Sequence, residues 1–95
     1  MKGTKKIKPP KIDFDFETMK WKNVTLSQIQ IWQELYKGID VMRIVGKDIP
    51  CAIDRQVDHI DGKIIIKGWV QGKTDWKRTI TNWLKREQAK LQGVI

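Results

Sequence analysis

The chain has 95 residues, of which 40% are hydrophobic and five are tryptophan, and its formal net charge at pH 7 is +8. This length excludes more than one small domain. Cys51 is the only cysteine, which excludes an intramolecular disulfide. No apolar run approaches the ~20 residues that a membrane span needs, and the N-terminal lysines precede no signal-peptide core, so we expect a cytoplasmic protein.

The charge is unevenly distributed. Residues 1–11 contain five lysines and no acid, residues 12–61 contain six cations and nine acids, and residues 62–95 contain eight cations and two acids. A basic tail and a basic C-terminal third therefore flank a mildly acidic middle. This asymmetry indicates a polyanionic partner such as nucleic acid, with a surface charged for solubility as the alternative.

Residues 1–11, which include Pro9 and Pro10, show no apolar periodicity. They predict a disordered basic tail, either a functional arm or a solubilising leader, ahead of a single domain over residues 12–95. From Ile12 to Glu17 apolar and acidic residues alternate, as in a strand. Because no pairing strand is evident nearby, we expect an extended segment that lays Phe14 and Phe16 onto the helices.

The first helix has signals at both ends. Thr25 followed by Gln28 is a capping-box pattern, and Gly38 suits the C-terminal end. Between them, apolar residues recur at helical spacing: Leu26, Ile29, Trp32, Leu35 and Tyr36. We expect these side chains to form the buried face of the helix.

Two shorter helices are expected next. Asp40 can cap a helix that begins at Val41 and is interrupted by Gly46 and Pro50. Pro50 suits the first turn of another helix. That third helix would have an apolar side made of Ile53, Val57 and Ile60.

The stretch after Asp61-Gly62, which predicts a turn, has two readings. Residues 63–70 contain three consecutive isoleucines between Gly62 and Gly68. This favours a short buried strand, and a helix that runs into Trp69 is the alternative.

The last helix carries the most informative pattern. Thr74 predicts its N-cap, and it is expected to cover about residues 75–91 and to end at Gly93. One face is apolar and is expected to be core: Trp76, Ile80, Trp83 and Leu84. The other side carries cations and a hydroxyl: Lys77, Arg78, Thr81, Lys85 and Arg86. Together these elements predict a mainly α fold, a small single-domain bundle of three to four helices.

Signals for catalysis or metal binding are weak. Cys51 and His59 cannot supply the four ligands of a zinc site, so we expect Cys51 to be a small buried hydrophobe and His59 a surface residue. The nearby aspartates are expected to form a solvated acidic edge: Asp54, Asp58 and Asp61. There is no glycine-rich phosphate loop. We therefore expect no enzymatic activity, metal, cofactor or small-molecule substrate.

Single-stranded nucleic acid is bound by cations along its backbone and by aromatic side chains that stack on its bases. Six cations are candidates for phosphate contacts: Lys73, Lys77, Arg78, Lys85, Arg86 and Lys90. Trp69 and Trp21 lie outside the helical stripes and are candidates for stacking. A place in the core, or at its edge, is the alternative for each.

Two parts of the sequence resemble a known family. One is Trp21–Gln28 with Trp32–Tyr36 and Ile39–Val41, and the other is Trp69 with Trp76–Gln88, which contains Asn82-Trp83-Leu84-Lys85-Arg86. Together they are similar to a small helical domain at the C-terminal end of bacteriophage and prophage replication proteins, which act as replication initiators, replisome organisers or helicase loaders. The stretch from Pro50 to the isoleucine run looks like an insertion, and the family's N-terminal DNA-binding or AAA+ domain is not recognisable. The resemblance therefore implies single-strand binding or replisome contact.

The sequence thus predicts a non-enzymatic accessory protein of phage or mobile-element DNA replication in a bacterial host cell. It would bind single-stranded DNA, a replication protein such as a helicase, primase or polymerase, or both. The alternative is a phage-encoded module that binds and modulates a host or phage enzyme without contacting DNA. The acidic, aromatic segment Asp13–Glu17 suits that second role.

Overall fold

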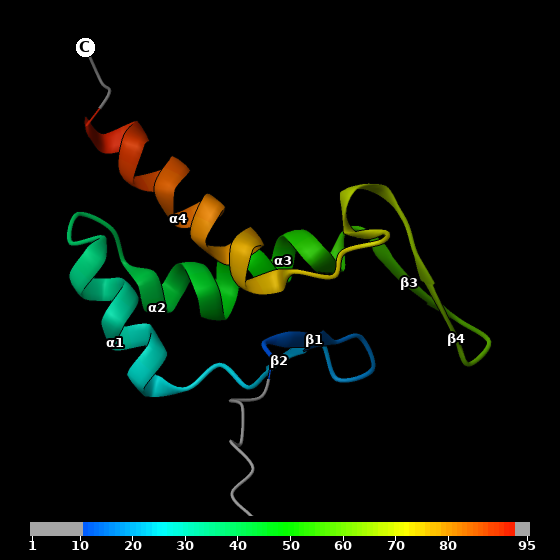
Figure 1. Cartoon of the computed structure of the whole chain (residues 1–95). Coiled ribbons are helices and arrows are strands. Elements are labelled where there is room, and N and C mark those ends of the chain that lie inside the picture. The colour runs from blue at the N-terminus through cyan, green and yellow to red at the C-terminus, as the bar shows by residue number, and fades with distance from the viewer. Residues whose placement is uncertain (1–10, 93–95) are drawn as a thin grey trace, which may run out of the picture.

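The computed structural model describes residues 11–92 (Figure 1). The helices are α1 (Leu26–Leu35), α2 (Val41–Arg43), the π-helical turn η1 (Ile44–Asp48), α3 (Ile49–Asp54), the 3-10 helix η2 (Gly68–Val70) and α4 (Trp76–Gln92). The strands are β1 (Asp13–Asp15), β2 (Lys20–Lys22), β3 (Val57–Ile60) and β4 (Lys63–Ile66), which form two separate antiparallel pairs. The fold is therefore α+β, and the prediction of a mainly α bundle is wrong. The tail predicted for residues 1–11 lies, apart from Lys11, outside the described residues.

The first hairpin shows why the strands escape prediction. β1 pairs with β2 so that Phe14 lies opposite Trp21, which corrects the expectation that no strand is available to pair with this segment. The partner strand is three residues long, too short to show an alternating pattern. In the turn, the Asp15 carboxylate accepts hydrogen bonds from the backbone N–H groups of Glu17 at 2.9 Å and Thr18 at 3.4 Å. The bond from Glu17 lowers the pKa of the Asp15 carboxyl because it stabilises the charged form.

α1 begins as predicted. The hydroxyl of Thr25 accepts a hydrogen bond from the Gln28 backbone N–H at 3.1 Å. Trp32 is buried in the expected face, but Leu26 and Leu35 of the same stripe are 69% and 66% exposed. The predicted orientation of the helix is therefore right for Trp32. The expected burial of Leu26 and Leu35 is wrong, because the neighbouring elements cover only the middle of the apolar stripe.

A single side chain fixes the turn from α1 into α2. The Gln33 Nε2 donates to the carbonyls of Tyr36 at 3.1 Å and Ile39 at 2.8 Å, and its Oε1 accepts from the Val41 N–H at 3.0 Å. These bonds satisfy backbone groups that a helix end leaves without partners. The helix ends at Leu35 with Tyr36 as its C-cap, so the predicted C-cap at Gly38 is wrong. Gln33 holds the turn instead.

α2, η1 and α3 form one continuous helix over residues 41–54. Asp40 caps it as predicted, because its carboxylate accepts from the Arg43 N–H at 3.2 Å. The expected interruption at Gly46 and Pro50 does not occur. Helical backbone continues through both residues, with a wider turn over Ile44–Asp48.

The wide turn explains how Pro50 is accommodated. The Ile49 N–H donates to the Ile44 carbonyl, the i to i−5 pairing of a π-helix. In the same register the Val45 carbonyl would pair with residue 50, which as proline has no N–H. The indole N–H of Trp21 donates to that carbonyl instead, at 2.6 Å. A hydrogen bond from the first hairpin thus replaces one that the helix lacks.

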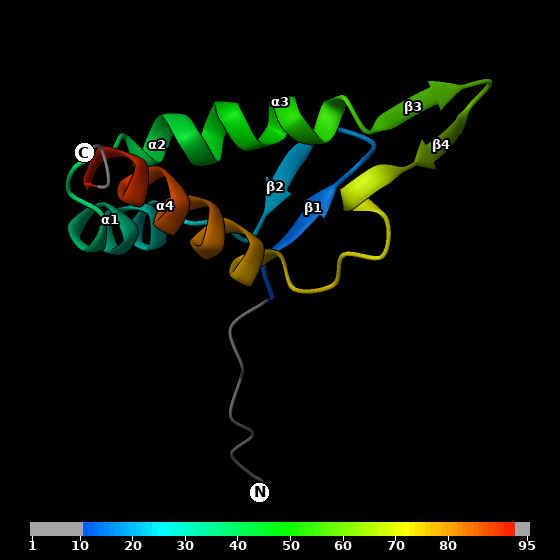
Figure 2. The same cartoon turned by 90° about the horizontal axis from the view of Figure 1, so that it is seen from above.

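Residues 57–66 form a second hairpin, so the predicted helical placement of Val57 and Ile60 is wrong. Its two-residue turn has φ angles of 51° at Asp61 and 73° at Gly62, the left-handed pair of a type I′ turn. The strand reading of the isoleucine run is confirmed over Lys63–Ile66, but the expected burial is wrong, since Ile65 is 46% exposed. Figure 2 shows this hairpin projecting from the helical part of a flat molecule that measures 57 × 44 × 19 Å.

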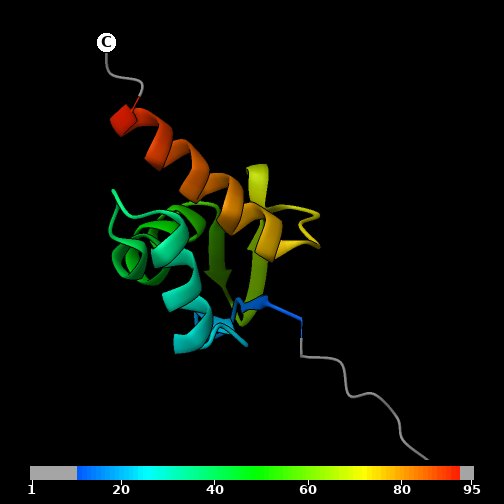
Figure 3. The ribbon, with the colours of Figure 1, turned by 60° about the vertical axis from the view of Figure 1, so that its left-hand side comes forward.

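α4 packs over the long helix and the first hairpin. Asp75, rather than the predicted Thr74, caps it by accepting from the Arg78 N–H at 3.0 Å. Figure 3 looks almost along the long helix, and α1 and α4 approach it from different directions. The core between them is made of large apolar side chains that are at most 2% exposed: Trp32, Val41, Ile44, Val45, Ile49, Ile53, Val70, Trp76, Ile80 and Leu84. The predicted helix end, Gly93, lies outside the described residues.

Candidate nucleic-acid interface

Trp76 is the centre of a connected group of aromatic rings at the start of α4. It is 2% exposed, and its ring centroid lies 5.6 Å from that of Trp21, 5.9 Å from Phe14, 6.2 Å from Phe16 and 6.5 Å from Trp69. Packing of this kind adds to the apolar burial of each ring. The group joins the first hairpin, η2 and α4, and so fixes Trp69 beside the last helix.

The backbone of η2 holds Trp69 at the surface. Gly68 has a left-handed φ of 63°, and a Cβ there would overlap the side chain of Gln56, so both the backbone angle and the space favour glycine. Val70 at the other end of η2 is buried. Between these two anchors the Trp69 side chain is 39% exposed. Its ring centroid lies 5.9 Å from that of Trp83 in α4, with the two ring planes 56° apart.

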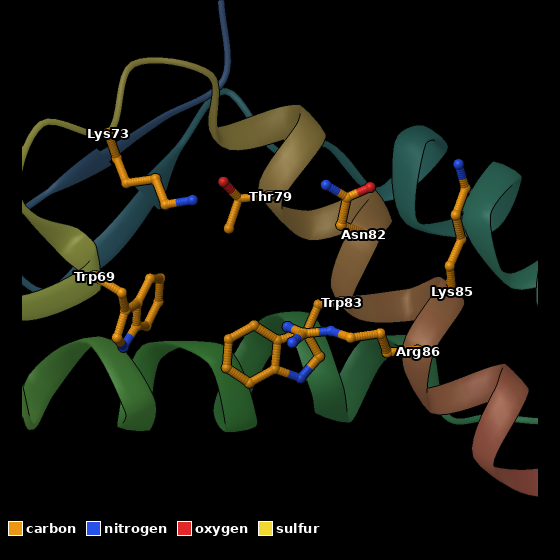
Figure 4. A pocket seen from close by; sticks show the side chains of 7 residues that line it. All are labelled: Trp69, Lys73, Thr79, Asn82, Trp83, Lys85 and Arg86. Carbon is orange, nitrogen blue, oxygen red and sulfur yellow. The ribbon is translucent and has the colours of Figure 1, made fainter.

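These two indoles lie in an open groove of about 740 Å³, which we call the tryptophan groove (Figure 4). Its residues come from η2, the following loop and one flank of α4: Trp69, Lys73, Thr79, Asn82, Trp83, Lys85 and Arg86. Three of these residues are cationic and none is acidic. The groove therefore combines aromatic surface with positive charge.

Cations lie close to both rings. The Nζ of Lys73 is 5.8 Å from the Trp69 centroid, and the guanidinium carbon of Arg86 is 5.5 Å from the Trp83 centroid. Both distances fall within the range of cation–π attraction. Figure 4 shows the two side chains reaching toward the rings, whereas Lys85 points away from them. Lys73 and Arg86 are thus the cations nearest to a ligand stacked on the indoles.

The tryptophan groove gathers four of the eight predicted site residues: Lys73, Lys85, Arg86 and Trp69. The other four lie elsewhere. Lys77 lines a separate groove on the opposite flank of α4, and Arg78 is exposed outside both grooves. Lys90 is paired with Glu87 at 2.9 Å near the end of the helix. Trp21 is half-buried, with its N–H bonded to Val45, so it covers the edge of the core.

Three residues of the tryptophan groove were not predicted as site residues. Trp83 was expected in the core but is only partly buried. Thr79 and Asn82 flank it, and the Thr79 hydroxyl donates to the Asp75 carbonyl at 3.2 Å. With Arg86 these residues form a second stripe at i, i+3, i+4 and i+7 along α4. That spacing was readable in the sequence, but which of two adjacent stripes faces solvent depends on where η2 packs.

The remaining candidate groups do not form a site. Cys51 is exposed, so the prediction of a buried thiol is wrong. His59 is exposed as expected, and its Nε2 lies 2.8 Å from the carbonyl of Phe16. Asp58 accepts from Lys67 at 3.2 Å. Across residues 11–92, no three His, Cys, Asp or Glu side chains gather into a group that could hold a metal ion.

Within the same residues, no helix combines the length and the apolar character needed to cross a membrane. No protein-family model, no curated protein and no solved structure matches the chain. The tryptophan groove is therefore the basis for a functional proposal.

Proposed function

We propose that this protein binds single-stranded nucleic acid, with single-stranded DNA as its ligand, in the tryptophan groove. One observation carries the proposal: an exposed indole, Trp69, shares with three cations a groove whose lining residues include no acid. The exposed face of Trp69 would stack on a base. Lys73 and Arg86 would neutralise the phosphates on either side of it.

A comparison of interaction energies favours displacement of Lys73 from the Trp69 ring by a base. A cation–π contact at an exposed site stabilises by ~0.5–1 kcal/mol. Stacking of a base on an aromatic side chain contributes ~1–3 kcal/mol. The lysine can also exchange its ring contact for a phosphate, so the stacked arrangement is favoured on both counts.

The accessibility of the bases favours a single strand over a duplex. In a duplex each base face is covered by its neighbours, so none is offered to an indole without unstacking. In a single strand the bases are accessible, and stacking on an aromatic ring tolerates any sequence. We therefore expect little sequence preference.

The resemblance to phage replication proteins extends the proposal to a biological setting. Single-stranded DNA is exposed during replication, and a small protein with a basic, aromatic groove and no catalytic constellation among its described residues fits an accessory, non-enzymatic role there. Contact with a helicase, primase or polymerase belongs to the same proposal.

A fluorescence anisotropy titration of labelled oligothymidine at two salt concentrations tests it. Three phosphate contacts, by Lys73, Lys85 and Arg86, would give a slope of log affinity against log salt of about −2, since each contact to a single strand contributes about −0.7. Absence of any binding at low salt would remove the proposal.

A protein-binding module is the second candidate, and α1 supplies the observation that favours it. Three of its large aliphatic side chains are 53–69% exposed: Leu26, Ile31 and Leu35. The acidic segment Asp13–Glu17 suits this role less, because Phe14 is buried. A module that binds only protein would give no signal with oligothymidine at low salt, which separates the two functions in the same titration.

A further inference from the structure

A second groove lies on the opposite flank of α4, at its N-terminal end. It has a volume of about 550 Å³, and two lysines line it, Lys11 and Lys77. Asp75 lies in the same groove and caps α4 by accepting from the Arg78 N–H, so the two lysines outweigh a single carboxylate. We call it the lysine groove. It offers positive charge without an aromatic ring.

The exposed face of α4 joins the two grooves. A helix turns about 100° per residue, so Arg86 on the tryptophan-groove flank is followed around the helix by Lys85 and Arg78 on the outer face, and then by Lys77 on the other flank. All four side chains are exposed. None of them takes part in an ion pair among residues 11–92. Arg86 also lies roughly 13.5 Å further along the axis than Lys77, at ~1.5 Å per residue, so the cations form a band that runs obliquely around the helix toward its N-terminus.

The charge along the axis of α4 favours this crossing path over a lengthwise one. Beyond Arg86 the next cation is Lys90, whose ammonium is paired with the carboxylate of Glu87 at 2.9 Å. Toward the helix end the neighbouring exposed residues, Ala89 and Leu91, are apolar. A polyanion that leaves the tryptophan groove therefore meets unpaired charge across the helix and neutralised charge along it.

We propose that single-stranded nucleic acid crosses α4, with its bases at Trp69 and Trp83 and its backbone passing over Arg78 to a phosphate subsite formed by Lys11 and Lys77. This inference rests on the proposed function. A helix with its side chains is ~10–12 Å across, so a strand that reaches both grooves needs several nucleotides. A trinucleotide would fill the tryptophan groove alone.

The difference in length supplies the test. The variant Lys11→Gln/Lys77→Gln is compared with wild-type protein for binding of a thymidine trinucleotide and a dodecanucleotide. A phosphate contact to a single strand contributes ~0.7 log units of affinity for each log unit by which the salt concentration lies below 1 M. At 0.1 M salt, each lost contact should therefore weaken binding about fivefold. We expect the dodecanucleotide to bind about 25-fold more weakly and with a flatter salt slope, and the trinucleotide to bind as before.

The matched control is Lys47→Gln/Lys63→Gln, which removes the same charge at two exposed lysines away from both grooves. It should leave both affinities nearly unchanged. Since Lys11 and Lys77 are exposed, a thermal melt should be unaltered in the test variant. Equal weakening of both oligonucleotides, or no weakening of the longer one, overturns the crossing path while the tryptophan groove stands. Wild-type protein that binds neither oligonucleotide overturns both.

Discussion

The indole N–H of Trp21 donates to the carbonyl of Val45 at 2.6 Å, and that carbonyl is the one for which Pro50 provides no helical partner. A proline inside a helix usually leaves an unsatisfied acceptor and a kink. Here the first hairpin supplies the donor. The same bond explains why Trp21 lies against the core and not in the tryptophan groove.

Trp21→Phe should therefore destabilise the fold without affecting the groove. The substitution keeps an aromatic ring against Phe14 and Trp76 but leaves the Val45 carbonyl without its partner. An acceptor left unsatisfied in the interior costs ~1–3 kcal/mol. Urea unfolding should show a loss of this size, and oligonucleotide affinity under native conditions should be unchanged.

A double-mutant cycle with Pro50→Ala tests the cause. Alanine restores an N–H at position 50, which can pair with the Val45 carbonyl in the π-helical register. Trp21→Phe should then cost less in the Pro50→Ala background than in the wild type. Strictly additive effects would show that the two residues are energetically independent.

Gln33→Leu should destabilise the connection between α1 and α2. The substitution preserves much of the side-chain bulk but removes hydrogen bonds to Tyr36, Ile39 and Val41. Each such bond contributes ~0.5–1.5 kcal/mol net, so we expect a loss of about 2–4 kcal/mol in chemical denaturation. The neighbour Gln30→Leu is the matched control: Gln30 is exposed on the same helix, and its substitution should have little effect.

Local signals in this sequence predicted local structure. The hydroxyl of Thr25 and the carboxylate of Asp40 cap helices as expected, because a cap depends only on residues within one turn. The phase of α4 was also right for Trp76, Ile80 and Leu84. Half of the cationic and aromatic candidates, Lys73, Lys85, Arg86 and Trp69, share one groove.

What was missed depends on contacts between distant segments. β1 and β2 are too short to show a period, and they are ordered by packing of Phe14 and Trp21 on Trp76. Pro50 predicted a break because a proline disfavours helical backbone at the residue before it, and nothing in the sequence links Pro50 to Trp21. The exposure of Trp83 follows from the position of η2, more than ten residues earlier in the chain.

Two glycines should respond oppositely to alanine because of their backbone angles. A Cβ added at Gly46 or at Gly62 would have no atom within 4 Å, so steric overlap plays no part at either position. Gly46 lies within the long helix, and Gly46→Ala should stabilise by ~0.5–1 kcal/mol. Gly62 has a φ of 73°, and Gly62→Ala should destabilise by ~1 kcal/mol or more. Thermal melts of both variants compare the two directly.

Charge reversal in the tryptophan groove should abolish oligonucleotide binding and leave the fold intact. Lys73→Glu/Arg86→Glu replaces two exposed cations beside the rings, so neither change disturbs the core. Oligothymidine affinity should fall below detection at 0.1 M salt, because two attractive phosphate contacts become repulsive. Lys20→Glu/Lys47→Glu is the control with the same net charge. If both variants lose affinity equally, binding depends on overall charge and not on the groove.

Substitutions at Trp69 separate stacking from electrostatics. Trp69→Leu retains apolar bulk against Trp76 and Trp83 but cannot stack a base, so affinity should fall by ~1–3 kcal/mol while the salt slope stays the same. Trp69→Phe keeps a π face and should recover much of the loss. The salt slope distinguishes this variant from the charge-reversal variant, which removes phosphate contacts and should therefore flatten the slope. Isothermal titration with oligothymidine at three salt concentrations measures both quantities, and a Trp69→Leu variant that binds like wild type would place the bases elsewhere on the protein.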